Sequence, residues 1–206
     1  MKTLAILGAS GHGKVVADIA ESTGWDEIVF FDDNWPSITC VEGWEVIGTF
    51  ADLLLSQISS VFVAIGDGNT RYDKLRLLEG KNKTLETIIH PSSIISKYAC
   101  VGAGSIICEG AVIKAFSKVG MANIINSNAT IGHDCLIGDA CHISLSTSIA
   151  GNVSIGFGSW VGNSASIRQN ITIGQNVMIG TGSVVVKDVD ANFTVVGNPA
   201  SQMISK

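Results

Sequence analysis

Two histidines in the second half of the chain could do acid–base chemistry. His133 is followed directly by Asp134, and His142 lies a short distance further along. A neutral imidazole accepts a proton near pH 7, and a neighbouring carboxylate fixes its tautomer and raises its basicity. His133, assisted by Asp134, could therefore be a general base that removes a proton from a nucleophile. The alternative that the residues leave open is a pair of solvated surface histidines. His90, which precedes Pro91, is interpreted as structural.

A glycine-rich loop near the N-terminus could hold a phosphate group. It runs from Gly8 to Lys14 between a strand-like and a helix-like run, where backbone N–H groups and the helix dipole favour an anion. Its spacing imitates a P-loop, but Val15 stands where Ser or Thr would bind magnesium, which argues against nucleoside triphosphate hydrolysis. Asp32 and Asp33 end the second strand-like run, and a second glycine loop begins at Gly66. Both segments could hold a ribose, a base or a phosphate.

The region that carries these loops alternates strand-like runs with helix-like stretches. The strand-like runs cover residues 4–7, 28–31 and 61–65, and the helix-like stretches cover residues 13–23, 50–57 and 69–79. Such alternation with short connections predicts a parallel α/β sheet. The region is too short for a complete dinucleotide fold, so we expect a truncated Rossmann-like domain over residues 1–85.

The region that carries the two histidines has a six-residue repeat. Every sixth residue from Ile89 to Val185 is Ile or Val, the next residue is often Gly, and the fourth residue after each of these aliphatic anchors is usually small. This period fits neither a helix nor a simple strand. It predicts a coil of three short strands, about eighteen residues per turn, whose anchors stack inside while small residues and glycines allow tight corners. The anchors are scaffold, so function must lie in residues that depart from the pattern.

The composition excludes several classes of function. The 206 residues carry a net charge of -5 with a pI near 5.2, so the electrostatic basis for binding nucleic acid or an anionic membrane is missing. No run approaches the roughly 20 apolar residues that span a bilayer, and the N-terminal apolar run stops at Gly8, which indicates a strand rather than a signal peptide. The cysteines form no C-x-x-C pair. We therefore expect no disulfide framework, no metal site and a cytoplasmic location.

The order of these segments resembles a known family. The chain runs from GASGHGKVVADIA through FFDDN and VAIGDGNTR to the hexads, and its segment 196–200 is similar to the G-x-P-A ending of hexapeptide acetyltransferases. Over essentially the whole chain it resembles the sugar acetyltransferases of the NeuD and PglD type. The resemblance implies an α/β N-terminal Rossmann-like domain at residues 1–85 that binds a nucleotide sugar. It also implies a left-handed parallel β-helix at residues 86–206 that binds acetyl-CoA and ends in a C-terminal tail.

The resemblance also implies a reaction and its residues. Members of the family use acetyl-CoA to acetylate the amino group of a nucleotide-linked 4-amino sugar, or a hydroxyl of sialic acid, without a metal. The family base is a His followed by an acidic residue, frequently Glu, so Asp134 is one methylene shorter. The residues implied to bind the nucleotide sugar are Ser10, Gly11, His12, Asp32, Asp33 and Gly66. Those implied to bind acetyl-CoA are His142 near the thioester and, largely through the backbone, Gly151, Asn163 and Thr181. We expect a homotrimer with active sites between subunits, because in this family a neighbouring prism closes the cleft.

Three alternatives stay open. O-acetylation of sialic acid or another sugar hydroxyl differs only in the acceptor. A β-helical, zinc-dependent carbonic anhydrase would need three protein ligands, whereas only His133 and His142 lie within the hexads. A non-enzymatic nucleotide-sugar-binding scaffold would use the prism for assembly alone. The residues do not separate UDP, GDP and CMP sugars, and they do not identify the acetylated group or the backbone donor for the oxyanion.

Overall fold

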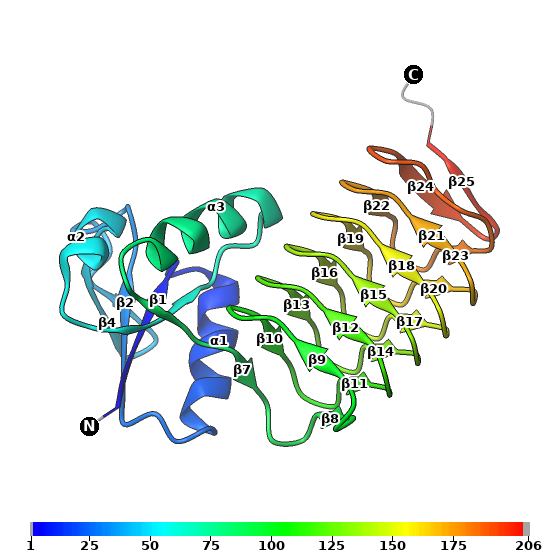
Figure 1. Cartoon of the computed structure of the whole chain (residues 1–206). Helices are drawn as coiled ribbons and strands as arrows, with labels where there is room; N and C mark the ends of the chain where they lie inside the picture. The colour runs from blue at the N-terminus through cyan, green and yellow to red at the C-terminus, as the bar shows by residue number, and fades with distance from the viewer. Residues whose placement is uncertain (1, 204–206) are drawn as a thin grey trace. The chain divides into compact units, whose positions relative to one another are not determined.

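A computed structural model describes residues 2–203 of the chain (Figure 1). Contacts divide the chain into two compact units, Met1–Pro91 and Ser92–Lys206. Each unit has its own buried apolar core. No helix among the described residues is long and apolar enough to cross a bilayer.

The first unit is a sheet with helices, as its alternating pattern predicts. The strand order is β3-β4-β2-β1-β5-β6, and β1 pairs in parallel with both β2 and β5. The strands are β1 (Thr3–Leu7), β2 (Glu27–Phe31), β3 (Cys40–Val41), β4 (Trp44–Gly48), β5 (Ser60–Val63) and β6 (Thr84–Leu85), followed by β7 (Ile88–Ile89). The helices are α1 (Gly11–Glu21), α2 (Phe50–Leu55) and α3 (Gly68–Glu79). The antiparallel pair of β3 and β4 was not predicted by the sequence pattern.

Apolar strands and one face of α1 make the core of this unit. Leu4, Ile6 and Phe30 are fully buried in the sheet, and Val16 and Ile19 of α1 are buried as well. Because the carboxyl ends of neighbouring parallel strands lie at the same edge of a sheet, the loops that follow β1, β2 and β5 meet there.

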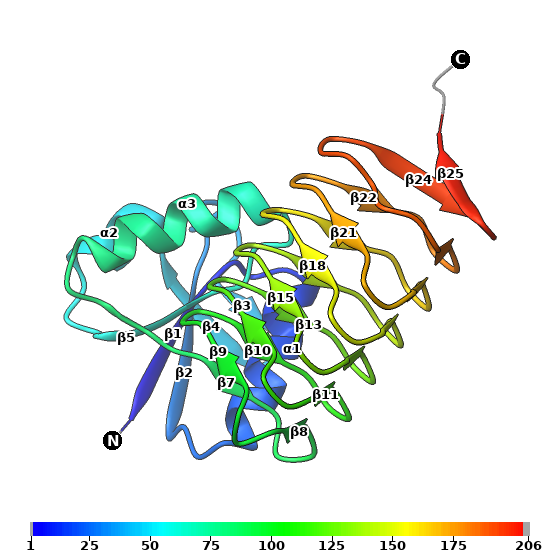
Figure 2. The ribbon, with the colours of Figure 1, turned by 45° about the vertical axis from the view of Figure 1, so that its right-hand side comes forward.

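The second unit is a left-handed parallel β-helix, which confirms the predicted triangular coil. Its first sheet contains β10 (Ile106–Ile107), β13 (Ile124–Ile125), β16 (His142–Ile143), β19 (Trp160–Val161), β22 (Met178–Ile179), β24 (Thr194–Gly197) and β25 (Ala200–Gln202). Its second sheet contains β8 (Ile94–Ile95), β11 (Val112–Ile113), β14 (Thr130–Ile131), β17 (Ser148–Ile149), β20 (Ser166–Ile167) and β23 (Val184–Val185). Its third sheet contains β9 (Cys100–Val101), β12 (Lys118–Val119), β15 (Leu136–Ile137), β18 (Ser154–Ile155) and β21 (Thr172–Ile173). Figure 2 shows the short strands of successive coils stacked on one another.

The aliphatic anchors fill the prism. Ile107 pairs with Ile125 and Ile125 with Ile143, so each coil places an anchor directly above the previous one. Most anchors are fully buried, but Ile95 and Val101 are only partly buried and Ile89 is 39% exposed. The stacking of anchors from Ile107 onward therefore confirms the predicted interior, whereas the first anchors are not fully enclosed.

The glycines that follow the anchors do not form the corners, contrary to the prediction. A Cβ on Gly102 would lie 2.5 Å from the carbonyl carbon of Gly120, and a Cβ on Gly156 would lie 2.5 Å from the amide nitrogen of Gln175. These glycines are needed because the next coil lies against them. The left-handed backbone of each corner comes two residues later, for example at Asn128 (φ 58°), since Asn, Asp and small residues tolerate positive φ better than bulky ones.

The small residues at the fourth position after an anchor also link the coils. The Oγ of Ser117 donates to the carbonyl oxygen of Gly132 (2.5 Å) and accepts from the amide of Cys135 (3.0 Å), both on the next coil. Ser159, at the corner between β18 and β19, makes the same pair of hydrogen bonds with Gly174 and Val177 of the next coil. Where this position is Ser, the side chain therefore satisfies buried backbone groups as well as fitting the corner.

Candidate functional site

His133 and Asp134 lie together on the corner between β14 and β15. The Nδ1 atom of His133 is 2.7 Å from Oδ2 of Asp134, and the two side chains are 65% and 55% exposed. Consecutive side chains of a strand point to opposite faces, but Asp134 has a left-handed backbone (φ 58°) that turns the chain at this point. The shorter Asp therefore reaches the ring, and its contact is with Nδ1 and not with Nε2 of His133.

His142 lies on the outward face of the first sheet, in a polar and aromatic cluster. Its ring packs on Trp160 of the next coil with centroids 4.7 Å apart, and its Nε2 is 3.3 Å from Nδ2 of Asn126 on the previous coil. The Oδ1 atom of Asn126 accepts from the amide of Ser127 (2.8 Å), so the NH2 group must face His142. An amide nitrogen can only donate, hence Nε2 of His142 is an acceptor and the ring is neutral in this arrangement.

Asn163 and Thr181 line one pocket beside this cluster. The pocket has a volume of about 320 Å³, and its walls also include Trp160 and Met178. The indole Nε1 of Trp160 donates to Oγ of Ser144 (2.8 Å), which holds the indole ring in place. Two of the predicted acetyl-CoA residues are thus brought together, one coil beyond His142.

The two predicted histidines are not brought together within one chain. His133 lies on the corner between the second and third sheets, whereas His142 lies on the first sheet. In a triangular prism this corner is the vertex opposite the first sheet. Gly151 lies on the coil above His133 at the same corner, so it lies with His133 and not with Asn163 and Thr181.

In the first unit, the carboxyl edge of the sheet carries the predicted nucleotide-sugar residues. Oδ2 of Asp32 accepts from the amide of Ala9 (2.8 Å), and Oδ1 accepts from the amide of Asn34 (2.9 Å). Burial acts to raise the pKa of Asp32, but these hydrogen bonds outweigh it and hold the pKa below its usual value. Asp33 accepts from the amide of Phe50 (3.0 Å) at the start of α2. Both aspartates therefore brace neighbouring loops of the protein itself.

The start of α1 is open for a ligand. Ser10 is the N-cap residue but its side chain makes no capping hydrogen bond. Apart from the adjoining residues and the backbone of α1 itself, no atom of residues 2–203 lies within 4 Å of the position that a Cβ on Gly11 would take. The Nε2 atom of His12 is buried and has no hydrogen-bond partner among residues 2–203. Burial, with a contribution from the charge of Arg71, lowers the pKa of His12 to about 4. His12 is therefore neutral at pH 7 and can contact a ligand only as a neutral donor or acceptor.

Four residues near these sites were missed by sequence reasoning. Arg71 of α3 is only 1% exposed, and its Nη1 donates to the carbonyl oxygens of Ile65 (2.7 Å) and Gly66 (2.9 Å). It thus places a buried positive charge under the second glycine loop. The signal was a lone arginine at the end of the VAIGDGNTR motif. The others are Asn126, Ser144 and Trp160, of which the first two directly follow an anchor where Gly is usual.

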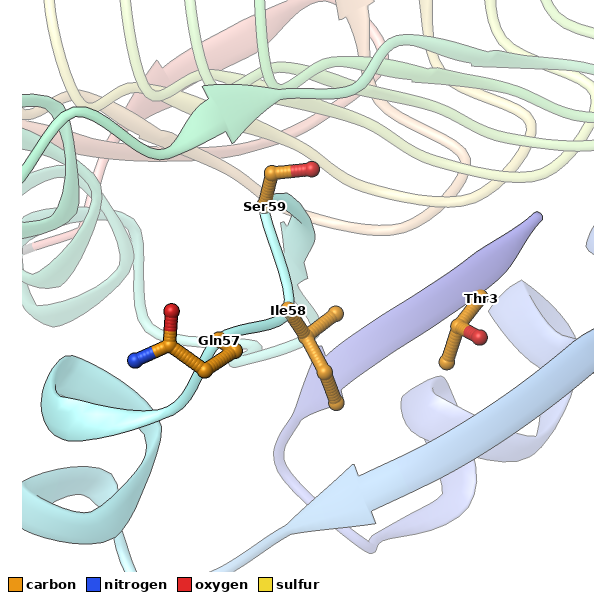
Figure 3. Close-up of a pocket in the computed structure, with 4 residues that line it drawn as sticks. All are labelled: Thr3, Gln57, Ile58 and Ser59. Atoms are coloured by element: carbon orange, nitrogen blue, oxygen red, sulfur yellow. The ribbon is translucent and has the colours of Figure 1, made fainter. Parts of the chain in front are cut away.

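A further pocket lies in the first unit, at the edge of its sheet opposite to the glycine loops. Its volume is about 310 Å³, and Figure 3 shows its lining residues Thr3, Gln57, Ile58 and Ser59. Thr3 begins β1 and Ser59 directly precedes β5, so the pocket is at the amino-terminal ends of the strands. This pocket is therefore not at the carboxyl edge of the sheet, where the glycine loops lie. Within the described residues, no group of three or more His, Cys, Asp or Glu side chains is arranged to hold a metal ion.

Comparison with known proteins finds matches to both units. Residues 3–76 match the family model of the PglD N-terminal domain, and residues 152–187 match that of the bacterial transferase hexapeptide (six repeats). The chain is 35% identical over 112 residues to a UDP-N-acetylbacillosamine N-acetyltransferase of Bacillus subtilis (strain 168), covering 52% of this chain. The match spans about half the length of that relative, 51%.

Two solved structures are similar over almost the entire chain. One is the acetyltransferase domain of PglB from Neisseria gonorrhoeae FA1090 in complex with acetyl coenzyme A, with 38% identity, a TM-score of 0.94 and coverage of 98% of this chain and 99% of that one. The other is PerB from Caulobacter crescentus in complex with CoA and GDP-perosamine, with 32% identity, a TM-score of 0.92 and coverage of 98% and 97%.

Proposed function

This chain belongs to the NeuD- and PglD-type sugar acetyltransferases, and on that premise we propose that it transfers acetyl from acetyl-CoA to the amino group of a nucleotide-linked 4-amino sugar. The observation that carries the proposal is the 2.7 Å contact between His133 and Asp134 on an exposed corner of the β-helix. Nδ1 of His133 is engaged by the carboxylate, which leaves Nε2 to accept a proton.

The proposed reaction needs only one acid–base group. The sugar amine attacks the thioester carbonyl carbon and forms the new C–N bond, while Nε2 of His133 accepts the proton that the amine loses. The tetrahedral intermediate then collapses with cleavage of the C–S bond, and CoA leaves as a thiolate that takes up a proton. Asp134 holds the imidazole tautomer and stabilises the imidazolium that forms.

We assign the acetyl-CoA site to the first sheet and the nucleotide sugar to the N-terminal unit. The pocket lined by Asn163 and Thr181, one coil beyond His142, supports the first assignment. Gly151 lies at the corner that carries His133. The open start of α1 at Ser10 and Gly11 supports the second, because free backbone N–H groups at a helix N-terminus attract phosphate. His12, Asp32, Asp33 and Gly66 belong to this second site, with the aspartates acting mainly by bracing its loops.

The separation of the two histidines supports a homotrimer with composite sites. A site that uses both His133 and His142 must take them from two chains, because the corner of one prism faces away from its own first sheet. We therefore propose that the corner of one subunit meets the first sheet of the next. The five free cysteines are consistent with our proposal of a cytoplasmic enzyme.

The central test is the His133→Asn variant. Release of CoA thiol from acetyl-CoA is measured with a panel of UDP-, GDP- and CMP-linked 4-amino sugars, and the variant is expected to lose at least about 100-fold in kcat. His90→Asn is the matched control and should retain wild-type activity. Treatment of the product with hydroxylamine separates the acceptors, since it cleaves O-acetyl esters and spares amides. Full activity of His133→Asn would refute the mechanism, and a hydroxylamine-labile product would favour the O-acetylation alternative.

Mixed oligomers test the composite site. His133→Asn and His142→Ala chains are first assayed separately and are then co-refolded in equal amounts. If each site takes one histidine from each of two chains, random assembly gives about a quarter of sites with both native residues, and about that share of wild-type activity returns. If both histidines act within one chain, no mixture recovers activity.

A further inference from the structure

Gly151 has a position in the coil that does not itself require glycine. It is the second residue after the anchor Ile149, and all of the other sixteen positions of this kind, from Pro91 to Lys187, carry a side chain. The backbone of Gly151 has no positive φ, unlike that of corner residues such as Asn152. Neither the repeat nor the backbone conformation therefore explains the missing side chain.

The neighbour of Gly151 on the previous coil does explain it. A Cβ on Gly151 would lie 2.5 Å from Nε2 and 2.6 Å from Cε1 of His133. The bare Cα thus faces the end of the imidazole that carries the free nitrogen, while the other ring nitrogen is held by Asp134 at 2.7 Å. The amide of Asn152 donates to the carbonyl oxygen of His133 (2.8 Å), which ties the two coils together at this corner. His133 is therefore confined between a carboxylate and a backbone without a side chain.

From this geometry we propose that Gly151 is a positioning residue for the general base: its lack of a side chain seats the imidazole so that Nε2 lies where the acceptor loses its proton. The inference rests on the proposed function of His133. A methyl group at residue 151 would force the ring tip back from 2.5 Å to an ordinary contact of 3.4 Å, a retreat of 0.9 Å. Misplacement of a reacting group by about 1 Å can cost about 100-fold in rate.

The same substitution should leave the fold intact. The atoms that a Cβ would meet belong to the far end of an exposed side chain, which can move. At Gly132, by contrast, a Cβ would lie 2.6 Å from the backbone carbonyl carbon of Ala150, which cannot move without shifting the coil. Gly151→Ala and Gly132→Ala therefore separate displacement of the base from damage to the prism.

The test measures Gly151→Ala in the full-length chain. We expect kcat about 100-fold below wild type, with KM for acetyl-CoA, KM for the sugar and the thermal midpoint all unchanged. The ¹⁵N shifts of the His133 imidazole, assigned by their loss in His133→Asn, should change because the contact with Asp134 is altered. Gln169→Ala, at the equivalent position on the next coil, is the matched control and should match wild type in every readout. Gly132→Ala should lower the thermal midpoint.

Three outcomes would overturn the proposal. These are wild-type kcat in Gly151→Ala, a rise in KM for acetyl-CoA without a fall in kcat, or unchanged imidazole shifts. In addition, a positioning role requires that Gly151→Ala cost little further when combined with His133→Asn, and an equal loss in both backgrounds would contradict it. Failure of the proposed function is distinguishable, because then His133→Asn would itself remain active.

Discussion

Ser117 should stabilise the corner of the β-helix that carries His133 and Asp134. It is fully buried, and its hydroxyl donates to the carbonyl oxygen of Gly132 and accepts from the amide of Cys135. These two residues flank His133 and Asp134 on the next coil. Ser117→Ala removes both hydrogen bonds without adding volume, so its effect reports on these bonds alone.

The magnitude follows from what the two freed backbone groups can do. If the amide of Cys135 turns to the carbonyl oxygen of Gly132, as the amide of Ala129 does to that of Asn126 (3.1 Å), the cost is that of one net hydrogen bond, about 1 kcal/mol. If neither group finds a partner, each costs about 1–3 kcal/mol. We expect an intermediate loss of about 2 kcal/mol in the free energy of unfolding, or about 4–8 °C in the thermal midpoint.

Calorimetry and amide hydrogen exchange would measure this loss. The exchange of the Cys135 amide should accelerate in Ser117→Ala, because its acceptor is gone, while the amides of distant coils keep their protection. Ser148→Ala, which changes an exposed serine of β17, is the control and should stay within about 0.5 kcal/mol of wild type. Ser117→Cys should recover part of the loss, since Sγ of Cys135 makes an equivalent contact of 3.1 Å with the carbonyl oxygen of Ala150. A thermal midpoint for Ser117→Ala equal to that of wild type would refute the reasoning.

Three further predictions concern the two candidate binding sites. Asp32→Ala should lower the thermal midpoint at pH 7. Because the folded pKa of Asp32 is depressed, the difference in thermal midpoint from wild type should shrink as the pH falls below about 4, and a pH-independent difference in calorimetry would contradict this. The free energy of unfolding should fall as the pH drops from 6.5 towards 4, since His12 has a folded pKa of about 4 and takes up its proton more readily when unfolded. Denaturant titrations at several pH values should show a weaker pH dependence of this free energy in His12→Asn. Trp160→Ala removes the ring on His142 and a wall of the pocket at Asn163, so KM for acetyl-CoA should rise about tenfold, a loss of about 1.4 kcal/mol, while KM for the sugar stays constant in initial-rate kinetics.

The periodic parts of the fold were predictable from sequence. A hexad repeat places one anchor on each side of the prism, so the sequence pattern alone assigns the anchors from Ile107 onward to the interior. The alternation of strands and helices in residues 1–85 likewise predicts the parallel sheet. These features depend on local pattern and on burial, which act in the same way at every repeat.

The meaning of individual glycines was less predictable. The repeat predicts that the glycines after the anchors form the corners, but they are required because the next coil lies against them. The distinction depends on neighbours eighteen residues away, which the six-residue pattern does not separate from local turn geometry. Gly151 shows the same limit, because its close neighbour is the ring of His133 on another coil.

The sequence alone determines which types of residue the candidate site contains, and it predicts the pairing of His133 with Asp134. Only the folded chain shows that this pair lies on one corner while His142 lies on the opposite sheet. The same holds for Asn126, Trp160 and Arg71, whose contacts join separate coils or a helix to a strand end. The physical reason is that the repeat sets which residues point outward, whereas the closing of each coil into a triangle sets which side they face.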